Sequence, residues 1–182
     1  MKPREKLVAH EHVPLFRVLR AGHANPLDTS HSRFRPGRWN TRSFAVLYSC
    51  CSEFSARAVA RDRLRLAAVE VEELQPAARP QLSELEWSGR VVDVASAGGV
   101  GAAGFAPDYP QGVTHAQTQP RAEEWFGRKR EGIVCRGASL SRLGFSDWSG
   151  QHDRWGELAV FVENAARTVT LRRTRSDLEW LA

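Results

Sequence analysis

The sequence predicts a single α+β domain. Its 182 residues are the length of one domain or two very small ones. No internal repeat or low-complexity linker divides the chain. Segments typical of strands and helices follow one another without the regular alternation that builds a doubly wound parallel sheet, which favours the α+β class.

The first third of the chain predicts two strands and a helix. Short, apolar, β-rich segments at 14–19 and 44–49 are typical of strands. The polar segment 21–39 between them holds Asn-Pro and Pro-Gly turn signals and predicts a loop. Ser52 is suited to cap a helix over 53–66, where good helix formers occur without Gly or Pro.

The middle of the chain predicts two further strands between loops. Residues 69–80, closed by prolines, indicate a loop or a short helical turn. Apolar segments at 81–87 and 91–95 predict separate strands, because Ser88-Gly89 interrupts them. Residues 96–112 are rich in Gly, Ala and Pro and predict a loop.

The last third predicts one helix and three strands. Thr118 is expected to cap a helix that continues over 122–130, with acidic residues first and basic residues last, as the helix dipole favours. A loop is expected over 137–155. Apolar segments predict the strands 132–136, 157–163 and 168–173.

The composition indicates a cytoplasmic protein without a membrane span. No segment approaches the roughly 20 apolar residues that a span needs, and the first twelve residues lack the pattern of a secretory signal. We expect residues 1–12 to be frayed. Cys50, Cys51 and Cys135 form no disulfide framework and should be reduced.

The positive charge has a compositional explanation. Lys and Arg number 26 against 21 Asp and Glu, which gives +5, but nearly all of the basic residues are Arg. An Arg-, Ala- and Gly-rich chain is typical of a GC-rich genome, so direct nucleic-acid binding is not expected. Arginine also binds phosphate through paired hydrogen bonds, so a phosphate-bearing ligand fits this composition equally well.

Two short motifs suggest sites but lack their context. Gly99, Gly101 and Gly104 give the spacing of a dinucleotide-binding turn, yet Pro107 and further prolines leave no helix behind it, so we favour a loop. His10 has the spacing to share a metal with His12, but no third ligand lies nearby and no metal is expected.

A dispersed set of polar and aromatic residues would suit an anionic, partly aromatic ligand such as a dinucleotide. Each member also has a purely structural interpretation: Arg17 in a salt bridge, Trp39 as a core residue and Tyr48 as packing. Spacing does not separate these interpretations. The set comprises Arg17, Arg38, Trp39, Asn40, Tyr48, Arg136 and Ser139.

Four segments together resemble the RES family, the toxin half of bacterial toxin–antitoxin pairs. The resemblance covers roughly residues 14–163, and its most specific part is the Gly-Arg-Trp-Asn element with the Leu-Tyr strand. The segments are Leu15-Phe-Arg-Val18, Pro36-Gly-Arg-Trp-Asn40, Ala45-Val-Leu-Tyr48, and Thr118-Gln119 ahead of Glu131-Gly-Ile-Val-Cys-Arg136.

The resemblance implies an ADP-ribosyltransferase-like fold, a mixed sheet with flanking helices that binds NAD as substrate in a central cleft. It implies cleavage of the bond between nicotinamide and ribose, and neutralisation by a helix-turn-helix (Xre-type) antitoxin. Carried over by position, Arg17 and Tyr48 would be catalytic. The residues expected to bind NAD are Arg38, Trp39, Asn40 and Ser139.

The sequence departs from the family at its acidic residue. Val59 stands where the family has a carboxylate, and Asp62, about one turn further on, is the nearby substitute. The family serine is replaced by Gly137, which leaves Ser139 two positions late.

Two hypotheses remain. One is an enzyme whose acidic role has moved to Asp62 or elsewhere, acting by hydrolysis, phosphorolysis or protein ADP-ribosylation. The alternative is a degenerate RES fold that binds NAD, ADP-ribose or an antitoxin without turnover. A basic nucleic-acid binder is a weaker third idea, because the sequence offers charge but no motif.

Overall fold

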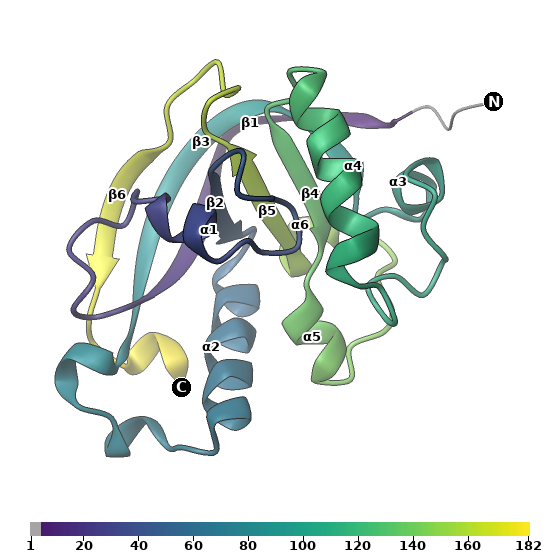
Figure 1. Cartoon of the computed structure of the whole chain (residues 1–182). Coiled ribbons are helices and arrows are strands. Elements are labelled where there is room, and N and C mark those ends of the chain that lie inside the picture. Colours follow the sequence, from purple (N-terminus) through teal and green to yellow (C-terminus); the bar gives the residue numbers. More distant parts are fainter. Residues whose placement is uncertain (1–4) are drawn as a thin grey trace.

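A six-stranded mixed sheet curls on itself and carries its helices on the outside (Figure 1). The computed structural model describes residues 5–182, apart from the side chains at 152 and 153. The strands are β1 (Leu7–Arg20), β2 (Val46–Cys50), β3 (Pro80–Val94), β4 (Gly132–Arg136), β5 (Gly156–Phe161) and β6 (Thr170–Arg175). The helices are α1 (Ser30–Phe34), α2 (Glu53–Ala67), α3 (Ala97–Ala102), α4 (His115–Gly127), α5 (Ala138–Arg142) and α6 (His152–Trp155). Three short 3₁₀ turns are η1 (Val71–Glu73), η2 (Pro76–Ala78) and η3 (Glu179–Leu181).

The strand pairing closes a ring. The order is β1-β2-β5-β4-β3-β6, and β1 also pairs with β3, so five strands form a circuit and β6 lies beside β3. All pairs are antiparallel except β3–β4, which is parallel over Val92–Val94. This arrangement confirms the predicted α+β class with a mixed sheet and flanking helices.

Alternation along the strands separates two apolar clusters. The inner cluster draws on all five strands of the ring and includes Leu15, Leu47, Leu85, Val134 and Leu158. The outer cluster packs beneath α3 and α4 and includes Trp39, Phe44, Tyr109, Trp125 and Phe161. The side chains that face away from the inner cluster are therefore the ones that meet the helices.

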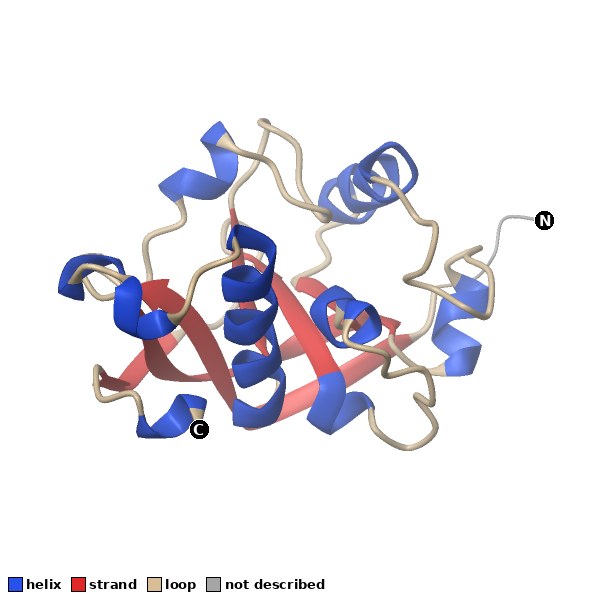
Figure 2. Ribbon diagram, turned by 90° about the horizontal axis from the view of Figure 1, so that it is seen from below, coloured by secondary structure: helices blue, strands red, loops and turns tan. Residues whose placement is uncertain are grey.

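The helix α2 forms as predicted and crosses the outer side of the sheet (Figure 2). Its N-cap is Ser52, whose Oγ accepts a hydrogen bond from the backbone N–H of Ser55 at 3.1 Å. Its C-cap is Ala68 in the left-handed conformation, with φ of 52°. A smaller cluster that includes Cys50, Ala56, Leu82 and Trp180 lies beneath it.

Two strand predictions are corrected. The strand β1 starts at Leu7, and the residues from Leu7 to His10, which were expected to be frayed, pair with β3. Residues 1–4 of the segment expected to be frayed lie outside the described part of the chain. The predicted break at Ser88-Gly89 is absent and β3 is one continuous strand. The Ser88 hydroxyl accepts the backbone N–H of His12 at 2.8 Å, where β1 carries an irregularity in register.

The helix predicted to start at Thr118 begins earlier. The N-cap of α4 is Thr114, which forms a reciprocal capping box with Gln117. Thr118 is buried inside the helix, and its hydroxyl donates to the carbonyl of Thr114. The cap prediction was wrong because Pro120 was assigned to the first turn, whereas it lies inside α4.

Two predicted loops contain short helices. Residues 96–112 include α3, whose N-cap Ser96 accepts the N–H of Gly99 at 3.1 Å. Residues 137–155 include α5 and α6. Among the described residues, no helix combines the length and apolar character of a membrane span.

Candidate functional site

The loop from Gly37 to Asn40 is anchored by one tyrosine on β2. The hydroxyl of Tyr48 accepts the backbone N–H of Trp39 and donates to Oδ1 of Asn40, both at 2.8 Å. That same oxygen accepts the N–H of Gly37 at 2.9 Å. A Cβ at Gly37 would lie 2.8 Å from the Tyr48 hydroxyl, so only glycine allows this approach. Tyr48 therefore orders the loop.

Two residues of the loop are buried and structural. Nδ2 of Asn40 donates to the carbonyls of Ser32 and Thr41, and Nε1 of Trp39 donates to Sγ of Cys135 at 3.1 Å. The Trp39 ring packs against Phe105, Tyr109 and Trp125. These contacts fix the backbone on both sides of Arg38.

Arg38 is the residue of this loop whose side chain still has hydrogen-bond donors available for a ligand. Its Nη1 donates over long distances, 3.3 Å to the Tyr109 hydroxyl and 3.4 Å to the carbonyl of Arg136. Burial opposes its charge, but charge interactions with Tyr109, Glu157 and Cys135 outweigh burial and raise the pKa of Arg38. Within the described part of the chain, its Nε and Nη2 donate no hydrogen bond.

The acidic neighbour of Arg38 is Glu157, which sequence reasoning missed. Glu157 lies on β5 directly between Cys50 of β2 and Cys135 of β4. Strand alternation puts it on the same face as Tyr48, whose partner Ala159 is two residues further along β5. The sequence offered one signal: Glu157 is the single charged residue in the apolar segment from Gly156 to Phe161.

The carboxylate of Glu157 lies close to the end of β4. A Cβ built at Gly137, the position of the family serine, would lie 3.3 Å from Glu157 Oε1. The carboxylate of Glu157 forms no hydrogen bond or ion pair with the described side chains or backbone between residues 5 and 182. The glycine thus leaves space beside a carboxylate that no described side chain binds.

Asp62 lies elsewhere, in a clamp between α2 and α5. It is fully buried, and its two oxygens accept hydrogen bonds from Arg65 at 2.9 Å and from Arg142 at 2.6 and 2.9 Å. Burial opposes its charge, but the bonds from Arg142, Arg65 and Ser139 lower the pKa of Asp62. Ser139 joins the clamp, because its Oγ accepts from Arg142 at 3.2 Å.

Val59 packs against the apolar cluster beneath α2. Arg17 lies on a different face: its neighbour Phe16 pairs with Cys50 on the outer side, so Arg17 points the other way. Its guanidinium donates to the carbonyls of Pro26 at 2.5 Å and Asp28 at 2.9 Å, and burial lowers its pKa. The structure brings Arg38, Trp39, Asn40 and Tyr48 together, joins Asp62 to Ser139, and leaves Arg17 apart.

Cysteine and histidine chemistry finds no support at this face. Burial raises the pKa of Cys135 to about 11, so its thiol is neutral at pH 7 and a poor nucleophile. No group of three His, Cys, Asp or Glu among the described residues is arranged to hold a metal ion. The imidazole Nδ1 of His12, a residue considered above for metal binding, lies 3.3 Å from Oε1 of Glu86.

The glycine motif does not form a dinucleotide-binding turn. Gly99 and Gly101 lie within α3, and the first of them presses against Asp93, where a Cβ would meet its carbonyl at 2.4 Å. The glycines serve packing and the turn after α3, since Gly104 has φ of 77°.

Comparisons with known proteins agree with the fold. The family model described as RES domain matches residues 14–178. A chain of the crystal structure of the M. tuberculosis MbcT-MbcA toxin–antitoxin complex is similar, with a TM-score of 0.72 and 18% sequence identity. That similarity covers 91% of this chain and 84% of the other. A comparison with curated protein sequences finds no match.

Proposed function

Because this chain belongs to the RES domain family, we propose that it is the toxin of a toxin–antitoxin pair and that it consumes NAD. The observation that carries this proposal is the face shared by Arg38, Tyr48 and Glu157, where an arginine with unused donors lies near an unpaired carboxylate. A cation and an anion on the same face suit a ligand that carries phosphates and develops positive charge at its ribose.

Each residue has a distinct role in the proposed reaction. The bond between the nicotinamide nitrogen and the ribose carbon breaks, and its electron pair leaves with nicotinamide. The carboxylate of Glu157 stabilises the oxocarbenium ion that remains and accepts a hydrogen bond from a ribose hydroxyl. Arg38 binds the diphosphate. An acceptor oxygen then adds to the ribose carbon and releases a proton.

Glu157 is proposed to supply the carboxylate that position 59 lacks. Asp62 is poorly suited to this role, because both of its oxygens are bound by arginines. Glu157 has free oxygens, and Gly137 beside it leaves room that a serine side chain would reduce. The role of Arg17 as the family arginine stays a prediction, since its donors hold the segment at Pro26 and Asp28.

The alternative is a RES fold that binds NAD, ADP-ribose or an antitoxin without turnover. Val59 favours it, because a side chain packed in an apolar cluster does nothing for a cationic transition state. The two functions differ in one measurable quantity, the release of nicotinamide.

The test follows nicotinamide release from NAD by chromatography. Glu157→Gln keeps the shape and removes the charge, so we expect release to fall by roughly 10²- to 10³-fold, as for comparable electrostatic deletions. Glu72→Gln, at an exposed carboxylate on η1, is the matched control and should release nicotinamide like the wild type. Equal thermal stability of the variants would exclude misfolding.

Two results would contradict parts of the proposal. Normal release in Glu157→Gln would remove Glu157 from the site while leaving the NAD-consuming function intact. No release by the wild type, together with NAD binding and a gain of activity in Val59→Glu, would establish the non-catalytic alternative. The antitoxin is tested by co-expression with a small adjacent reading frame of helix-turn-helix pattern, which should relieve growth arrest.

A further inference from the structure

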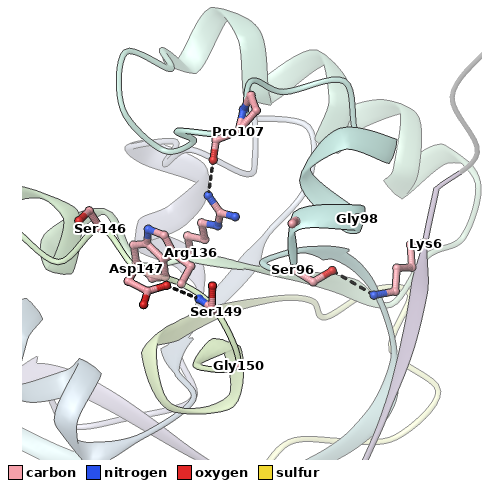
Figure 3. A pocket seen from close by; sticks show the side chains of 11 residues that line it. Lys6, Ser96, Gly98, Pro107, Arg136, Ser146, Asp147, Ser149 and Gly150 are labelled. Carbon is pink, nitrogen blue, oxygen red and sulfur yellow. Dashed lines mark hydrogen bonds between the residues drawn. The ribbon is translucent and has the colours of Figure 1, made fainter.

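A cavity lies beside the end of β4, where Arg136 is one of its lining residues. Its volume is about 500 Å³, and it opens between the start of α3 and the segment 146–150 (Figure 3). Of the residues proposed to act on NAD, none lines it. Its walls include Lys6, Ser96, Gly98, Arg136, Asp147 and Trp148.

Arg136 brings a buried positive charge to this cavity. The residue is only 6% exposed. Its Nε donates to the carbonyl of Ala95 at 2.9 Å, and its Nη1 donates to the carbonyls of Pro107 and Tyr109 at 2.7 and 2.8 Å. Figure 3 shows the guanidinium between Ser96 and Gly98 on one side and Asp147 and Ser149 on the other.

The charge of Arg136 forms no ion pair within the described residues; Asp93 acts on it only from beyond ion-pair distance and is already bound by Lys6. Nη2 of Arg136 donates to none of the described residues, and no carboxylate reaches ion-pair distance. Its compensation comes from carbonyl dipoles, from the more distant Asp93 and from the face of Trp148, 5.7 Å from the guanidinium carbon. Burial lowers its pKa, which expresses the cost of holding the charge there. A buried cation without an ion-pair partner is stabilised when an anion joins it.

The other charges of the cavity are already paired or lie at its rim. Lys6 binds Asp93 at 2.8 Å and the Ser96 hydroxyl at 3.0 Å, so its charge is neutralised. The carboxylate of Asp147 is exposed and accepts the N–H of Ser149 at 3.0 Å. Arg136 therefore carries the least compensated charge at this cavity, and the hydroxyls of Ser96, Ser146 and Ser149 also line it.

We propose that this cavity binds a phosphate group of a small molecule, with Nη2 of Arg136 as its inner donor. A phosphate supplies the missing negative charge and accepts several hydrogen bonds from guanidinium and hydroxyl groups. The volume also has room for the rest of a nucleotide-sized ligand beside Trp148. The proposal does not depend on NAD turnover, because it rests on the charge and shape of this cavity alone.

Two glycines of α3 provide a matched test. A Cβ at either Gly98 or Gly101 would meet no atom within 4 Å, so aspartate fits at both positions. Gly98 lines the cavity and Gly101 does not. In calorimetric titrations with inorganic phosphate, ADP-ribose and NAD, we expect Gly98→Asp to weaken binding at least tenfold and Gly101→Asp to bind like the wild type. Asp147→Asn should bind more tightly, because it removes negative charge from the rim.

The probes distinguish the source of the phosphate. Binding of inorganic phosphate alone would indicate a free phosphate site, and binding of ADP-ribose or NAD alone would indicate a nucleotide site; either supports the proposal. Absence of binding by all three probes, or equal binding by Gly98→Asp and the wild type, would overturn it. Phosphate binding without nicotinamide release would count against the NAD-consuming function only.

Discussion

At the scale of single residues, Asp93 shows how strongly one carboxylate is held at the end of β3. Its oxygens accept the backbone N–H groups of Ala95 and Ser96 at 2.9 Å, the Ser96 hydroxyl, and Lys6 at 2.8 Å. Burial opposes its charge, but these bonds outweigh burial and lower the pKa of Asp93 from 3.8 to about 2.

The lowered pKa predicts a specific pH dependence. The folded pKa lies below the unfolded one, so the stabilisation is fully present above pH ~4 and is lost as the pH falls towards ~2. Asp93→Asn should lower the free energy of unfolding by about 2 kcal/mol at neutral pH, and this difference should shrink in acid. Chemical unfolding at several pH values measures it. Asp108→Asn, at an exposed carboxylate, should show no such trend.

Site residues were only partly predictable from the sequence. The family resemblance implied that Arg38 and Tyr48 line one cleft, and in the structure their segments are joined through Trp39 and Asn40. The sequence did not reveal that Asp62 is bound by two arginines, since Arg142 is 80 residues away in the chain. Glu157 was hidden for the same reason: its neighbours come from β2 and β4.

At the scale of elements, the strand β3 depends on one glycine. A Cβ at Gly89 would lie 2.2 Å from Cζ2 of Trp87, whose ring is buried and whose Nε1 donates to the carbonyl of Arg167 at 3.1 Å. The indole ring therefore occupies the space above Gly89. Ser88-Gly89 suggested a break between two strands. In the continuous strand, Gly89 is the position where the Trp87 ring leaves no room for a side chain.

Gly89→Ala should therefore destabilise the protein by about 1–3 kcal/mol, because Trp87 must move from a packed position. Gly101→Ala is the matched control, since its Cβ meets no atom within 4 Å. This change in the helix α3 should leave stability unchanged or raise it by roughly 0.5–1 kcal/mol. Thermal unfolding of both variants measures the contrast, and equal stabilities would contradict the role assigned to Gly89.

Elements with strong local signals were predicted well. The helix α2 has its cap and an uninterrupted run of helix formers, and β4 is a short buried strand after a helix; both occur where expected. The start of α4 was misplaced, because Thr114 and Thr118 are both plausible caps and only the partner at Gln117 decides between them. Short helices such as α3 carry too few residues for a periodic signal.

At the scale of the whole molecule, the C-terminal turn η3 fastens α2 to the sheet. Nε of Arg57 donates to the carbonyl of Trp180 at 2.9 Å, and Arg61 donates to that of Leu181. The Trp180 ring is 1% exposed and packs with Val18 and Leu82. A residue near the end of the chain thus completes a cluster built by β1, α2 and β3.

Trp180→Ala should lower the free energy of unfolding by about 3–5 kcal/mol, the usual cost of removing a buried tryptophan. Trp180→Phe should cost much less, because the indole Nε1 has no hydrogen-bond partner among the described residues. Leu171→Ala on β6, where the side chain is 43% exposed, serves as the control. Denaturant unfolding measures all three, and a small effect of Trp180→Ala would show that η3 is dispensable.

The fold class was predictable, but the ring was not. The order of strands and helices carries the α+β class, because it depends on local pattern. The pairing of β1 with β3 joins residues 60 to 85 positions apart, so no local pattern in either strand indicates its partner. Closure of the sheet is a property of all the pairings together.

The strand pairings that close the ring differ greatly in length. The strand β1 pairs with β3 along nearly its whole length, from Leu7 to Arg20, whereas it meets β2 through the single pair Phe16 and Cys50. The junction of β1 and β2 is therefore the shortest pairing of the ring, one residue pair against three between β3 and β4 and five at each of the joints of β5. Arg17 follows Phe16 in β1, so the residue matched to the family arginine lies next to the single residue pair that closes the ring between β1 and β2.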